Sequence, residues 1–398
     1  MGKIIGIIAE FNPFHNGHAL LIEQGRRAGY TGCVAVMSGN FLQRGQIAIA
    51  EKHLRAHAAL LGGADLVLEL PVAAATSGAQ RFARAALGLL SAAGCVDTLC
   101  FGSECGDSNA LNQLTTILDS PAVTAQMRHY LQQGMGLPKA RALAVADLYG
   151  APLAQHLKGP NNMLALEYLR ANQQLQTPLQ PLTFTRTGAG HNAQSAHGRF
   201  ASASLIRGRA RAGADISAFV PPAAMQLYQN AAAAGQFPTA PDTLHTAMLS
   251  ALRRMPRAGF ALLPELSEGL QDRLYRCVRQ ARTYAELETL LKTKRYPTAR
   301  LRRLLLHAFL GITESAAALP PPYLRVLGFN PRGRALLTRM ADTATLPVSA
   351  SLARLREHSA ACAQAAALEA AATDQFALAL PQPLACGSDY TTPAVFLR

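Results

Sequence analysis

Two histidines near the start of the chain, His15 and His18, give the clearest indication of chemistry. They lie in the run GIIAEFNPFHNGH at residues 6–18, after an apolar stretch that predicts a buried strand over residues 4–8. A helical pattern begins near His18, so both imidazoles are expected beyond the carboxyl end of a strand, where open α/β sheets bind ligands. Imidazoles and free helix N–H groups suit a nucleotide triphosphate, whose negative charge grows at the α-phosphorus during attack. We predict a nucleotide site here, against the alternative that both histidines are ordinary surface or capping residues.

A second candidate phosphate site lies in the run ASASLIRGRAR at residues 201–211, which follows the stretch TRTGAGH at residues 185–191. Ser202 and Ser204, followed by Arg207, form a pattern typical of a serine-rich turn that opens a helix. We expect the backbone N–H groups, the hydroxyls and Arg207 to bind β- and γ-phosphates opposite the histidines. The alternative is a serine cap on an exposed, arginine-rich helix.

Two further loops follow predicted strands and are expected at the same edge of the sheet. The run SGNFLQRGQIAI at residues 38–49 contains Arg44, which could hold a phosphate or a carboxylate or could be an exposed arginine of a crossover loop. The run FGSE at residues 101–104 contains Gly102, which would let a backbone approach a base or ribose closely. This second signal is weak by itself, because glycines commonly end strands.

The run KGPNNMLALEYL at residues 158–169 places Asn161 and Asn162 just before a predicted helix. Either asparagine can cap that helix, which leaves the other free for a ligand. Lys158 could contact a phosphate or could be solvated.

A strongly basic run, KRYPTARLRRLLLH at residues 294–307, holds one lysine and four arginines among leucines at helical spacing. One face is expected to enter the core, and the other to form a stripe that contacts phosphates, unless it is simply a solvated helix face. Tyr296, Tyr323 and Phe329 are candidates for stacking on RNA bases.

The composition favours a polyanionic partner. The 398-residue chain has a formal charge of +14 and a pI near 9.9, although a generally basic proteome would give the same excess. Seven cysteines without a CxxC pair indicate reduced thiols and no zinc site. The first apolar run is too short for a signal peptide and no stretch is apolar enough to span a membrane, so we expect a cytoplasmic protein.

Strands and helices alternate through the first hundred residues, which predicts a Rossmann-like, doubly wound parallel sheet. Residues 109–172 and the chain beyond about residue 215 are expected to be mainly helical, with a short strand at residues 182–185. The simplest partition is a nucleotide-binding domain over residues 1–215 and a mainly helical, basic domain over residues 216–398. The expected strands cover residues 4–8, 33–37, 65–71 and 96–102, and the expected helices cover residues 18–28, 51–61, 80–93, 270–291, 299–310 and 359–373. The last residues are expected to form an irregular tail.

Taken in order, these segments closely resemble the bacterial tRNA(Met) cytidine acetate ligase family, within the HxGH nucleotidyltransferase superfamily. HxGH alone would indicate only the superfamily, whereas the FNPFHNGH, SGNFLQRG and LRVLGFN runs are specific to the family. The resemblance covers about residues 3–345, and the alanine-rich tail after it departs from the family pattern. Its other matching runs are KHLRAHAALLGGADLVLELPV, CFGSE, KGPNNMLALEYL, ASASLIR, KRYPTARLRRLLLH and PYLRVLGFNPRGRALL.

The resemblance implies a ligase that uses ATP, with Mg²⁺ on its phosphates, to activate acetate as acetyl-adenylate. The acetyl group then passes to the wobble cytidine of elongator tRNA(Met), giving N4-acetylcytidine. We expect His15 and His18 to stabilise the transition state at the α-phosphorus, and Ser204 and Arg207 to hold the leaving pyrophosphate. The implied ATP-binding segment comprises Ile7, Ile8, Ala9, Glu10, Phe11, Asn12, Pro13, Phe14, His15, Asn16, Gly17, His18, Ala19 and Leu20. Gly102, Arg186 and one of Asn161 and Asn162 are implied as further ATP contacts.

On this interpretation the first domain activates acetate and the second binds tRNA, with no membrane and no stable protein partner implied. One alternative is an HxGH adenylyltransferase that acts on a small phosphorylated cofactor precursor, but such enzymes usually need only one compact domain. The other alternative is a non-enzymatic RNA-binding module that keeps a relic nucleotide fold. The loss of catalytic function that this alternative assumes is not indicated by the sequence, which keeps His15, His18, Ser204 and Arg207.

Overall fold

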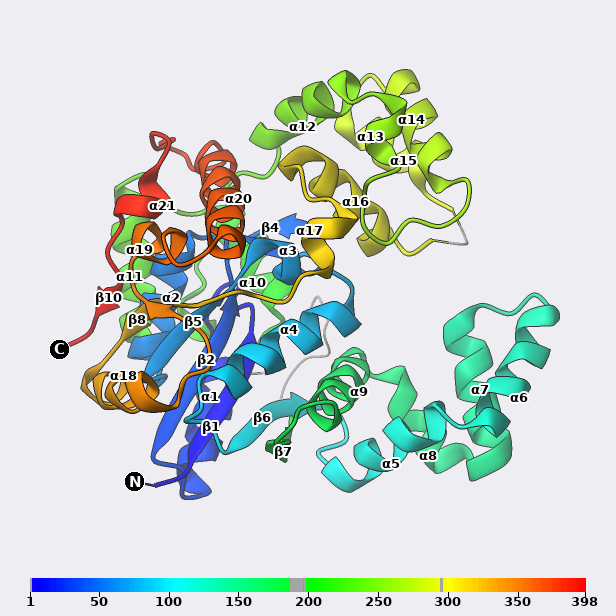
Figure 1. The fold of residues 1–398 in the computed structure, drawn as a ribbon, viewed down its shortest axis with the longest axis horizontal. Coiled ribbons are helices and arrows are strands. Elements are labelled where there is room, and N and C mark those ends of the chain that lie inside the picture. The colour runs from blue at the N-terminus through cyan, green and yellow to red at the C-terminus, as the bar shows by residue number, and fades with distance from the viewer. Residues whose placement is uncertain (1, 187–195, 197, 294–295) are drawn as a thin grey trace.

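The computed structural model describes residues 2–186, 196, 198–293 and 296–398. Within these residues an eight-stranded sheet runs in the order β10-β8-β5-β2-β1-β6-β7, with β9 added beside β8 (Figure 1). Neighbouring strands are parallel except for β5 and β8, which are antiparallel. The strands of the sheet are β1 (Ile4–Ala9), β2 (Gly32–Ser38), β5 (Leu66–Leu70), β6 (Thr98–Ser103), β7 (Gln180–Thr185), β8 (Leu324–Phe329), β9 (Val348–Ser349) and β10 (Val395–Phe396).

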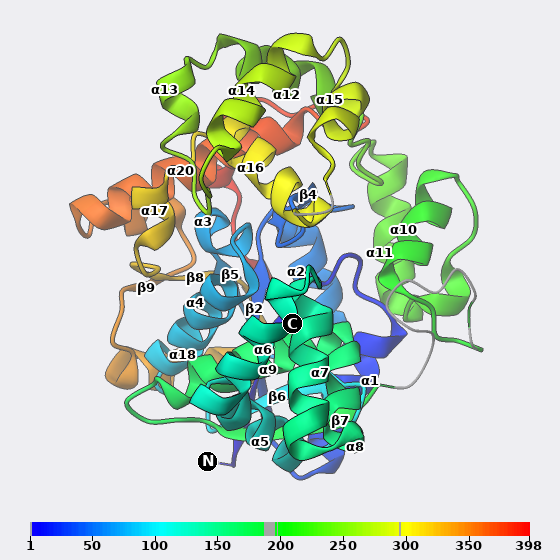
Figure 2. The same ribbon diagram turned by 90° about the vertical axis from the view of Figure 1, so that its right-hand side faces the viewer.

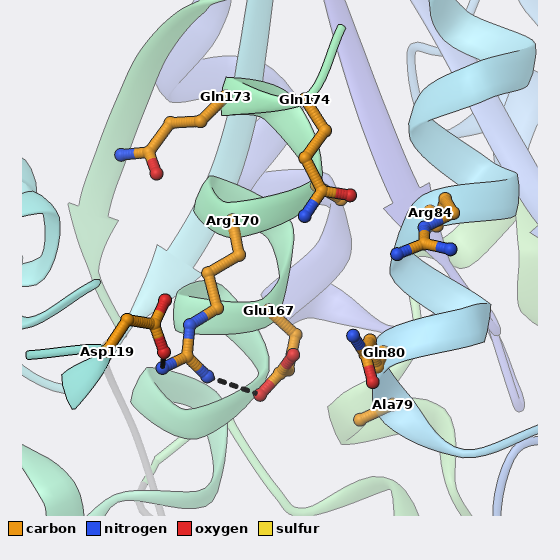
Figure 3. A pocket seen from close by; sticks show the side chains of 9 residues that line it. Ala79, Gln80, Arg84, Asp119, Glu167, Arg170, Gln173 and Gln174 are labelled. Carbon is orange, nitrogen blue, oxygen red and sulfur yellow. Dashed lines mark hydrogen bonds and ion pairs between the residues drawn. The ribbon is translucent and has the colours of Figure 1, made fainter. Parts of the chain in front are cut away.

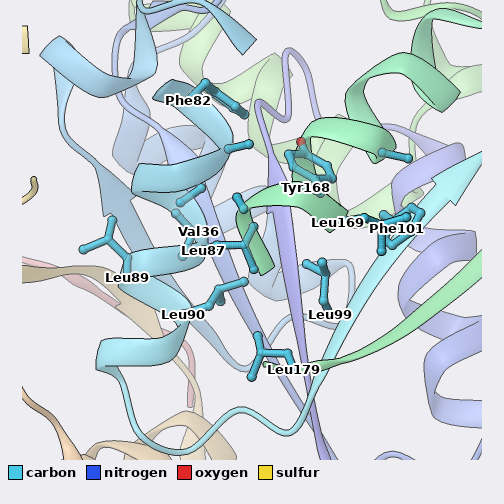
Figure 4. Close-up of a cluster of buried hydrophobic side chains, with 14 of the residues drawn as sticks. Val36, Phe82, Leu87, Leu89, Leu90, Leu99, Phe101, Tyr168, Leu169 and Leu179 are labelled. Atoms are coloured by element: carbon cyan, nitrogen blue, oxygen red, sulfur yellow. The ribbon is translucent and has the colours of Figure 1, made fainter. Parts of the chain in front are cut away.

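Apolar side chains project from both faces of the central strands, as expected for a sheet covered by helices on each side. Val36 and Leu99 point to one face, where they pack with Leu87, Leu90 and Tyr168 from the covering helices α4 and α9 (Figure 4). Ile5, Ala35 and Val67 belong to the cluster on the opposite face. The helices that pack around the sheet include α1 (Asn16–Arg27), α2 (Lys52–Leu61), α3 (Val72–Ala75), α4 (Ala79–Ala92), α9 (Pro160–Gln173), α10 (Ala203–Arg211), α11 (Pro222–Ala233) and α18 (Pro331–Thr343).

Two helical lobes extend from this body (Figure 1). The α5–α8 lobe, residues 108–155, projects beyond β6 and β7 and comprises α5 (Ser108–Leu118), α6 (Pro121–Gln132), α7 (Leu137–Tyr149) and α8 (Ala151–Gln155). The α12–α16 lobe, residues 243–310, comprises α12 (Thr243–Arg254), α13 (Arg257–Phe260), α14 (Leu270–Gln280), α15 (Tyr284–Leu291) and α16 (Thr298–Leu310). Its core includes Phe41 and Ile47 from a two-stranded hairpin, β3 (Phe41–Leu42) and β4 (Gln46–Ile47), so the lobe supports the loop that follows β2.

The prediction of a parallel, doubly wound sheet is confirmed, and its four predicted strands lie within two residues of the observed bounds. The expected helix over residues 270–291 is instead two helices, α14 and α15. Strand β8 was not predicted, because its six residues include Arg325. The partition at residue 215 stays a prediction, but β8 and β10 extend the sheet that the first hundred residues begin.

The expectation of an irregular C-terminal tail is wrong in part. Residues 381–398 include a short helix, α21 (Ser388–Thr391), and strand β10. Before them, α17 (Glu314–Ala318), α19 (Leu352–Arg356) and α20 (Ala360–Ala377) follow the α12–α16 lobe, and α20 confirms the helix expected over residues 359–373. Glu369 of α20 and Asp389 of α21 are buried with Lys52, Glu69 and Arg325 in one cluster of ion pairs. The tail adopts fixed structure because the carboxylate of Asp389 neutralises Lys52 and Arg325, which are buried beside the sheet.

All seven cysteines are free, as predicted. Among the described residues, no helix combines the length and the apolar character needed to cross a membrane.

Candidate nucleotide site

A cleft of about 720 Å³ lies at the carboxyl end of β1, within the size range of small-molecule sites. Ala9 pairs with Met37, so β1 and β2 end side by side and their following loops enter the same cleft. The cleft is also lined by residues from α4, α7, α9 and the first turns of α10 and α16. In Figure 2 the α12–α16 lobe lies above the sheet, and α6 and α7 lie in front of it. Both lobes therefore contribute walls to a site that the sheet positions.

The two predicted histidines meet in this cleft as a stacked pair, with ring centroids 3.8 Å apart. His15 is the N-cap of α1, and its Nδ1 accepts a hydrogen bond from the N–H of Gly17 at 3.0 Å. The Nδ1 of His18 accepts from the N–H of His15 at 3.3 Å. Because both Nδ1 atoms are acceptors, each neutral ring carries its proton on Nε2. Both histidines therefore cap the start of α1, as the alternative interpretation of the sequence proposes, and both also line the cleft.

Buried aromatic rings fix the position of His18. Phe11 and Phe14 are almost fully buried, and their ring centroids lie 5.0 and 5.6 Å from that of His18. The N–H of Phe14 donates to the hydroxyl of Tyr228 at 3.1 Å, which anchors the loop from the far side. Asn12 accepts from the N–H of Ile49 through its Oδ1 at 2.7 Å and so joins this loop to the next one. These contacts of the FNPF residues therefore fix the position of the histidine pair.

The environment keeps both imidazoles neutral. Burial, followed by the charges of Arg186 and Arg207, lowers the pKa of His15 to about 3. Burial, followed by the charges of His15 and Arg186, holds the pKa of His18 well below its usual 6.5. At neutral pH both rings are therefore uncharged Nε2–H donors, suited to an oxygen on which negative charge develops.

Arginines surround the cleft on several sides. Arg44, Arg186 and Arg207 line it. The sequence predicts phosphate contacts for Arg44 and Arg207, and the family resemblance implies an ATP contact for Arg186. Arg207 donates from Nη1 to the carbonyl of Asn12 at 2.8 Å, which ties α10 to the histidine loop. Arg141 of α7 and Arg302 of α16 also line the cleft and were not predicted there. Arg302 lies in the basic run and could have been included, whereas no local pattern marks Arg141.

The loop that carries Arg44 requires a glycine beside it. Gly45 has φ +71°, and a Cβ at this position would lie 2.5 Å from the backbone N of Arg303. The close approach lets α16 pack directly on the hairpin. Glu10 accepts from the N–H of Gln43 at 3.0 Å, which joins the same loop to the end of β1. The SGNFLQRG run is therefore explained by packing as well as by its place in the cleft.

The FGSE and KGPNN runs meet through Glu104. Its carboxylate accepts from the backbone N–H groups of Asn161 at 3.0 Å and Asn162 at 2.6 Å, and so caps α9. The side-chain oxygen of Asn162 accepts from the N–H of Glu104 at 2.8 Å, and its amide donates to the carbonyl of His156 at 3.0 Å. Asn162 is thus buried and fully engaged, whereas Asn161 lines the cleft and donates from Nδ2 to Oε1 of Glu104 at 2.6 Å. Of the two asparagines left open by the sequence, Asn161 is the one that lines the cleft.

The structure brings most of the other predicted site residues together, and those that line the cleft are Ile7, Ile8, Ala9, Glu10, Phe11, Asn12, His15, Gly17, His18, Asn161, Arg186, Ser204 and Arg207. Pro13, Phe14, Asn16, Ala19, Leu20, Gly102 and Asn162 lie outside this lining. Gly102 instead makes room for Arg186, whose Cγ would lie 2.9 Å from an added Cβ. Ser202 caps α10 by accepting from the N–H of Leu205 at 3.1 Å, so the capping alternative holds for this serine. Most of the TRTGAGH run lies outside the described residues.

Two of the three proposed RNA-stacking residues are not available, and the third is half-buried. Tyr296 and Tyr323 are buried, and Phe329 packs on Phe396 with ring centroids 5.2 Å apart. The prediction of a phosphate-binding stripe is also wrong for Arg303, whose charge is paired with the carboxylate of Glu265, whereas Arg300 donates to the backbone carbonyl of Glu265. Lys294 and Arg295 lie outside the described residues. Burial, which sequence spacing cannot reveal, removes these candidates.

Comparison with known proteins gives full-length matches. The HIGH Nucleotidyl Transferase family model matches residues 2–388. A tRNA(Met) cytidine acetate ligase from Syntrophomonas wolfei is 36% identical over 412 residues, which cover 98% of this chain and 99% of that protein. The apo crystal structure of Thermotoga maritima TmcAL is 29% identical with a TM-score of 0.92, and both chains are covered completely. The structure of the same protein bound with alpha-thio ATP is 28% identical with a TM-score of 0.90, again over 100% of both chains.

Proposed function

The chain belongs to the tRNA(Met) cytidine acetate ligase family, among the HIGH nucleotidyl transferases, and from this we propose how its cleft works. It binds ATP, activates acetate as acetyl-adenylate, and transfers the acetyl group to the wobble cytidine of elongator tRNA(Met) to give N4-acetylcytidine. The observation that carries the proposal is the pair of neutral, stacked histidines at a helix N-terminus inside an arginine-lined cleft. The full-length similarity to a protein that binds alpha-thio ATP supports the same assignment.

In the first step a carboxylate oxygen of acetate attacks the α-phosphorus of ATP. A phosphorus–oxygen bond forms, the bond from the α-phosphorus to the bridging oxygen breaks, and pyrophosphate leaves. Negative charge grows on the oxygens of the α-phosphate, and the Nε2–H groups of His15 and His18 donate to them. The protein makes no covalent bond in this step, so positioning and charge stabilisation provide the catalysis.

The first turn of α10 is proposed to hold the leaving pyrophosphate. Ser204 and Arg207 both line the cleft, one turn apart on this helix. Free N–H groups at a helix N-terminus and a guanidinium favour a phosphate group together. Arg186, which lines the cleft from the end of β7, adds a further cation near the triphosphate.

The remaining nucleotide contacts are proposed from the cleft lining. The end of β1 and the loop after it approach the ATP, and Asn161 contributes an amide at the N-terminus of α9. Among the described residues, no cluster of three His, Cys, Asp or Glu side chains could hold a metal ion. Mg²⁺ would be held by the phosphates of ATP and by water molecules, where it would neutralise part of the phosphate charge.

In the second step the exocyclic amine of the wobble cytidine attacks the carbonyl carbon of acetyl-adenylate. A carbon–nitrogen bond forms, the bond from the carbonyl to the phosphate oxygen breaks, and AMP leaves. The amine loses one proton to the departing phosphate or to water, since His15 and His18 already carry their Nε2 protons. The charge of +14 favours association with the RNA.

Acetate-dependent ATP–pyrophosphate exchange tests this proposal directly. Exchange that needs acetate but no tRNA is expected, because adenylate formation precedes transfer to RNA. Mapping of acetylated cytidine in elongator tRNA(Met) would then identify the acceptor. No exchange with or without tRNA would reject the acetyl-adenylate mechanism, and exchange that responds only to a small phosphorylated acceptor would support an adenylyltransferase instead.

A further inference from the structure

Two side chains just beyond the end of β1, those of Glu10 and Asn12, line the nucleotide cleft and extend toward the loop after β2. Oε1 of Glu10 accepts from the N–H of Gln43 at 3.0 Å, and Oδ1 of Asn12 accepts from the N–H of Ile49 at 2.7 Å. Gln43 and Ile49 both belong to the loop that contains the β3–β4 hairpin. The two side chains therefore lie on the same side of the histidine loop.

This side of the cleft differs from the side proposed to hold the nucleotide. Strand β1 lies between β2 and β6 in the sheet. Asn161 is bound by Glu104, directly after β6, and Arg186 follows β7, the next strand beyond β6. These nucleotide contacts thus lie across β1 from the loop after β2. Since the adenylate occupies the β6 side, we expect the acceptor base to enter from the β2 side.

Glu10 brings an uncompensated carboxylate to the β2 side. Among the described residues, two carboxylates line the cleft, those of Glu10 and Glu167. Glu167 also lines a small polar pocket between α4 and α9, where it is paired with Arg170 at 3.3 Å (Figure 3). Elsewhere in the described ranges no cation forms an ion pair with Glu10, and the bond from Gln43 is its one side-chain hydrogen bond. One oxygen of Glu10 is therefore available to accept from a ligand.

Asn12 supplies a complementary donor. Its side chain is 3% exposed, and its Nδ2 atom has no hydrogen-bond partner within the part of the chain that the structure describes. The orientation of this amide is fixed, because reversing it would place a donor against the N–H of Ile49. A buried donor without a partner is destabilising, so an orphaned donor in a cleft indicates where a ligand acceptor binds. The cleft thus presents an acceptor and a donor, two residues apart, to the same ligand.

We propose that Glu10 accepts a hydrogen bond from the exocyclic amine of the acceptor cytosine and that the amide of Asn12 donates to N3 of the same ring. The inference rests on the proposed function, because it assumes that a cytidine enters the cleft. Carboxylates accept from N4 of cytosine, and enzymes that act on a base read its Watson–Crick edge. The edge of uracil has the opposite pattern, with an acceptor at position 4 and a donor at N3.

The hydrogen bond to Glu10 also assists acetyl transfer. When N4 attacks the carbonyl carbon of acetyl-adenylate, a carbon–nitrogen bond forms, the bond to the phosphate oxygen breaks, and AMP leaves. Positive charge develops on N4, and the carboxylate of Glu10 stabilises it. One N4 proton passes to the departing phosphate or to water, and Glu10 accepts from the N–H that remains in the product. Glu10 is thus a catalytic residue of the second step.

The test compares Glu10→Gln with Glu167→Gln in the full-length protein. Glutamine at position 10 can still accept from Gln43, but its NH2 group opposes the cytosine amine. The control removes the other carboxylate of the cleft lining. Binding of anticodon stem-loops with cytidine or uridine at the wobble position is titrated with ATP and without acetate, so that no acetyl group is transferred. Acetylation of the cytidine stem-loop and acetate-dependent ATP–pyrophosphate exchange are then measured on the same proteins.

Wild type and Glu167→Gln are expected to bind the cytidine stem-loop about tenfold more tightly than the uridine stem-loop, and Glu10→Gln is expected to lose this preference. The variant Asn12→Asp, which keeps the acceptor for Ile49 but replaces the donor, should lose it too. In Glu10→Gln the rate of acetyl transfer should fall by about tenfold more than the rate of exchange.

A base preference equal to that of wild type in Glu10→Gln or Asn12→Asp would overturn the proposal. Equal losses of transfer and exchange in Glu10→Gln would also overturn it, because they would place this carboxylate at ATP or acetate. A purely structural role would not change the choice between cytidine and uridine. Absence of exchange in wild type would instead contradict the proposed function, and the base preference is measured without that reaction, so the two failures are distinguishable.

Discussion

The Nζ atom of Lys52 lies 2.7 Å from Oδ2 of Asp389, and neither side chain has any exposed surface. Lys52 begins α2, directly after the loops that line the nucleotide cleft, whereas Asp389 lies nine residues before Arg398, the last residue. Arg325 of β8 also pairs with Asp389, at 2.8 Å. Buried charges of this kind are tolerated only when each has its partner. The C-terminal segment therefore packs on the body that holds the sheet. The expected departure from the family pattern after about residue 345 is wrong, because the family model matches the chain through residue 388.

Replacing Asp389 by alanine should destabilise the protein strongly. The substitution leaves Lys52 and Arg325 buried with less compensating charge, and breaking a buried pair in this way costs about 3–5 kcal/mol. The free energy of unfolding from urea titrations measures the effect. Asp342→Ala, at an exposed position on α18, is the control and should change stability by less than about 0.5 kcal/mol. Equal unfolding midpoints for the two variants would show that the cluster does not hold the tail.

Stability should also depend on the protonation of Glu369. Burial, followed by the neighbouring Glu69 carboxylate, raises the pKa of Glu369 from 4.5 to about 8. The folded protein therefore holds this proton over a range of pH in which the unfolded chain has lost it. The resulting stability is present below about pH 4.5 and is lost as the pH rises through about 8.

The variant Glu369→Gln keeps the neutral form and should remove this dependence. Between pH 6 and pH 8.5, wild type is expected to lose about 1–3 kcal/mol more of its unfolding free energy than the variant. Urea titrations at the two pH values measure the difference. Equal losses of unfolding free energy in wild type and in Glu369→Gln would mean that Glu369 is already ionised at pH 6.

The sequence was sufficient to predict the sheet and the centre of the site, because both depend on local patterns. Near-continuous apolar strands separated by helices specify a parallel sheet, and parallel strands bring their carboxyl ends to one edge. His15, His18, Ser204 and Arg207 therefore meet as predicted, although nearly two hundred residues separate the two pairs.

The features that were missed depend on contacts between distant segments. Arg325 looks incompatible with a central strand until Glu69 and Asp389 are placed beside it. Arg141 enters the cleft only because the α5–α8 lobe turns back toward α9, where its Nη2 approaches the sulfur of Met163 at 3.4 Å. Conversely, the periodicity that suggested a free basic stripe could not reveal that Glu265 binds Arg300 and Arg303.

The variant His18→Ala should lose most of the adenylation activity. Removing one preorganised donor to a developing oxyanion costs about 2–4 kcal/mol, which corresponds to a fall of roughly 30- to 1000-fold in rate. Acetate-dependent ATP–pyrophosphate exchange measures this step without the RNA. The control His358→Ala removes an exposed imidazole outside the cleft lining and should leave the exchange rate unchanged. Near-normal exchange in His18→Ala would exclude the role assigned to this residue.

Asn161 and Asn162 should behave differently when each is replaced by alanine. Asn162 is 2% exposed, and its side chain accepts from the N–H groups of Glu104 and Cys105. The variant Asn162→Ala leaves these donors unpaired, which should lower the unfolding free energy by about 1–3 kcal/mol. Asn161→Ala should instead raise the KM for ATP by roughly two- to tenfold, since its side chain lines the cleft. Its loss of stability should be the smaller of the two, because it removes one hydrogen bond, from the Asn161 amide to Glu104, and leaves no buried donor unpaired.

Urea titrations and ATP–pyrophosphate exchange on both variants separate the two roles, with each variant serving as the control for the other. The same helix start carries both residues, so a general disturbance of α9 would affect them alike. The side-chain oxygen of Asn162 holds the backbone of Glu104, whose carboxylate caps the helix. Asn162→Ala should therefore mainly lower the unfolding free energy, whereas Asn161→Ala should mainly raise the KM for ATP. A higher KM for ATP in Asn162→Ala at full stability, with Asn161→Ala unaffected, would reverse the assignment of the nucleotide contact.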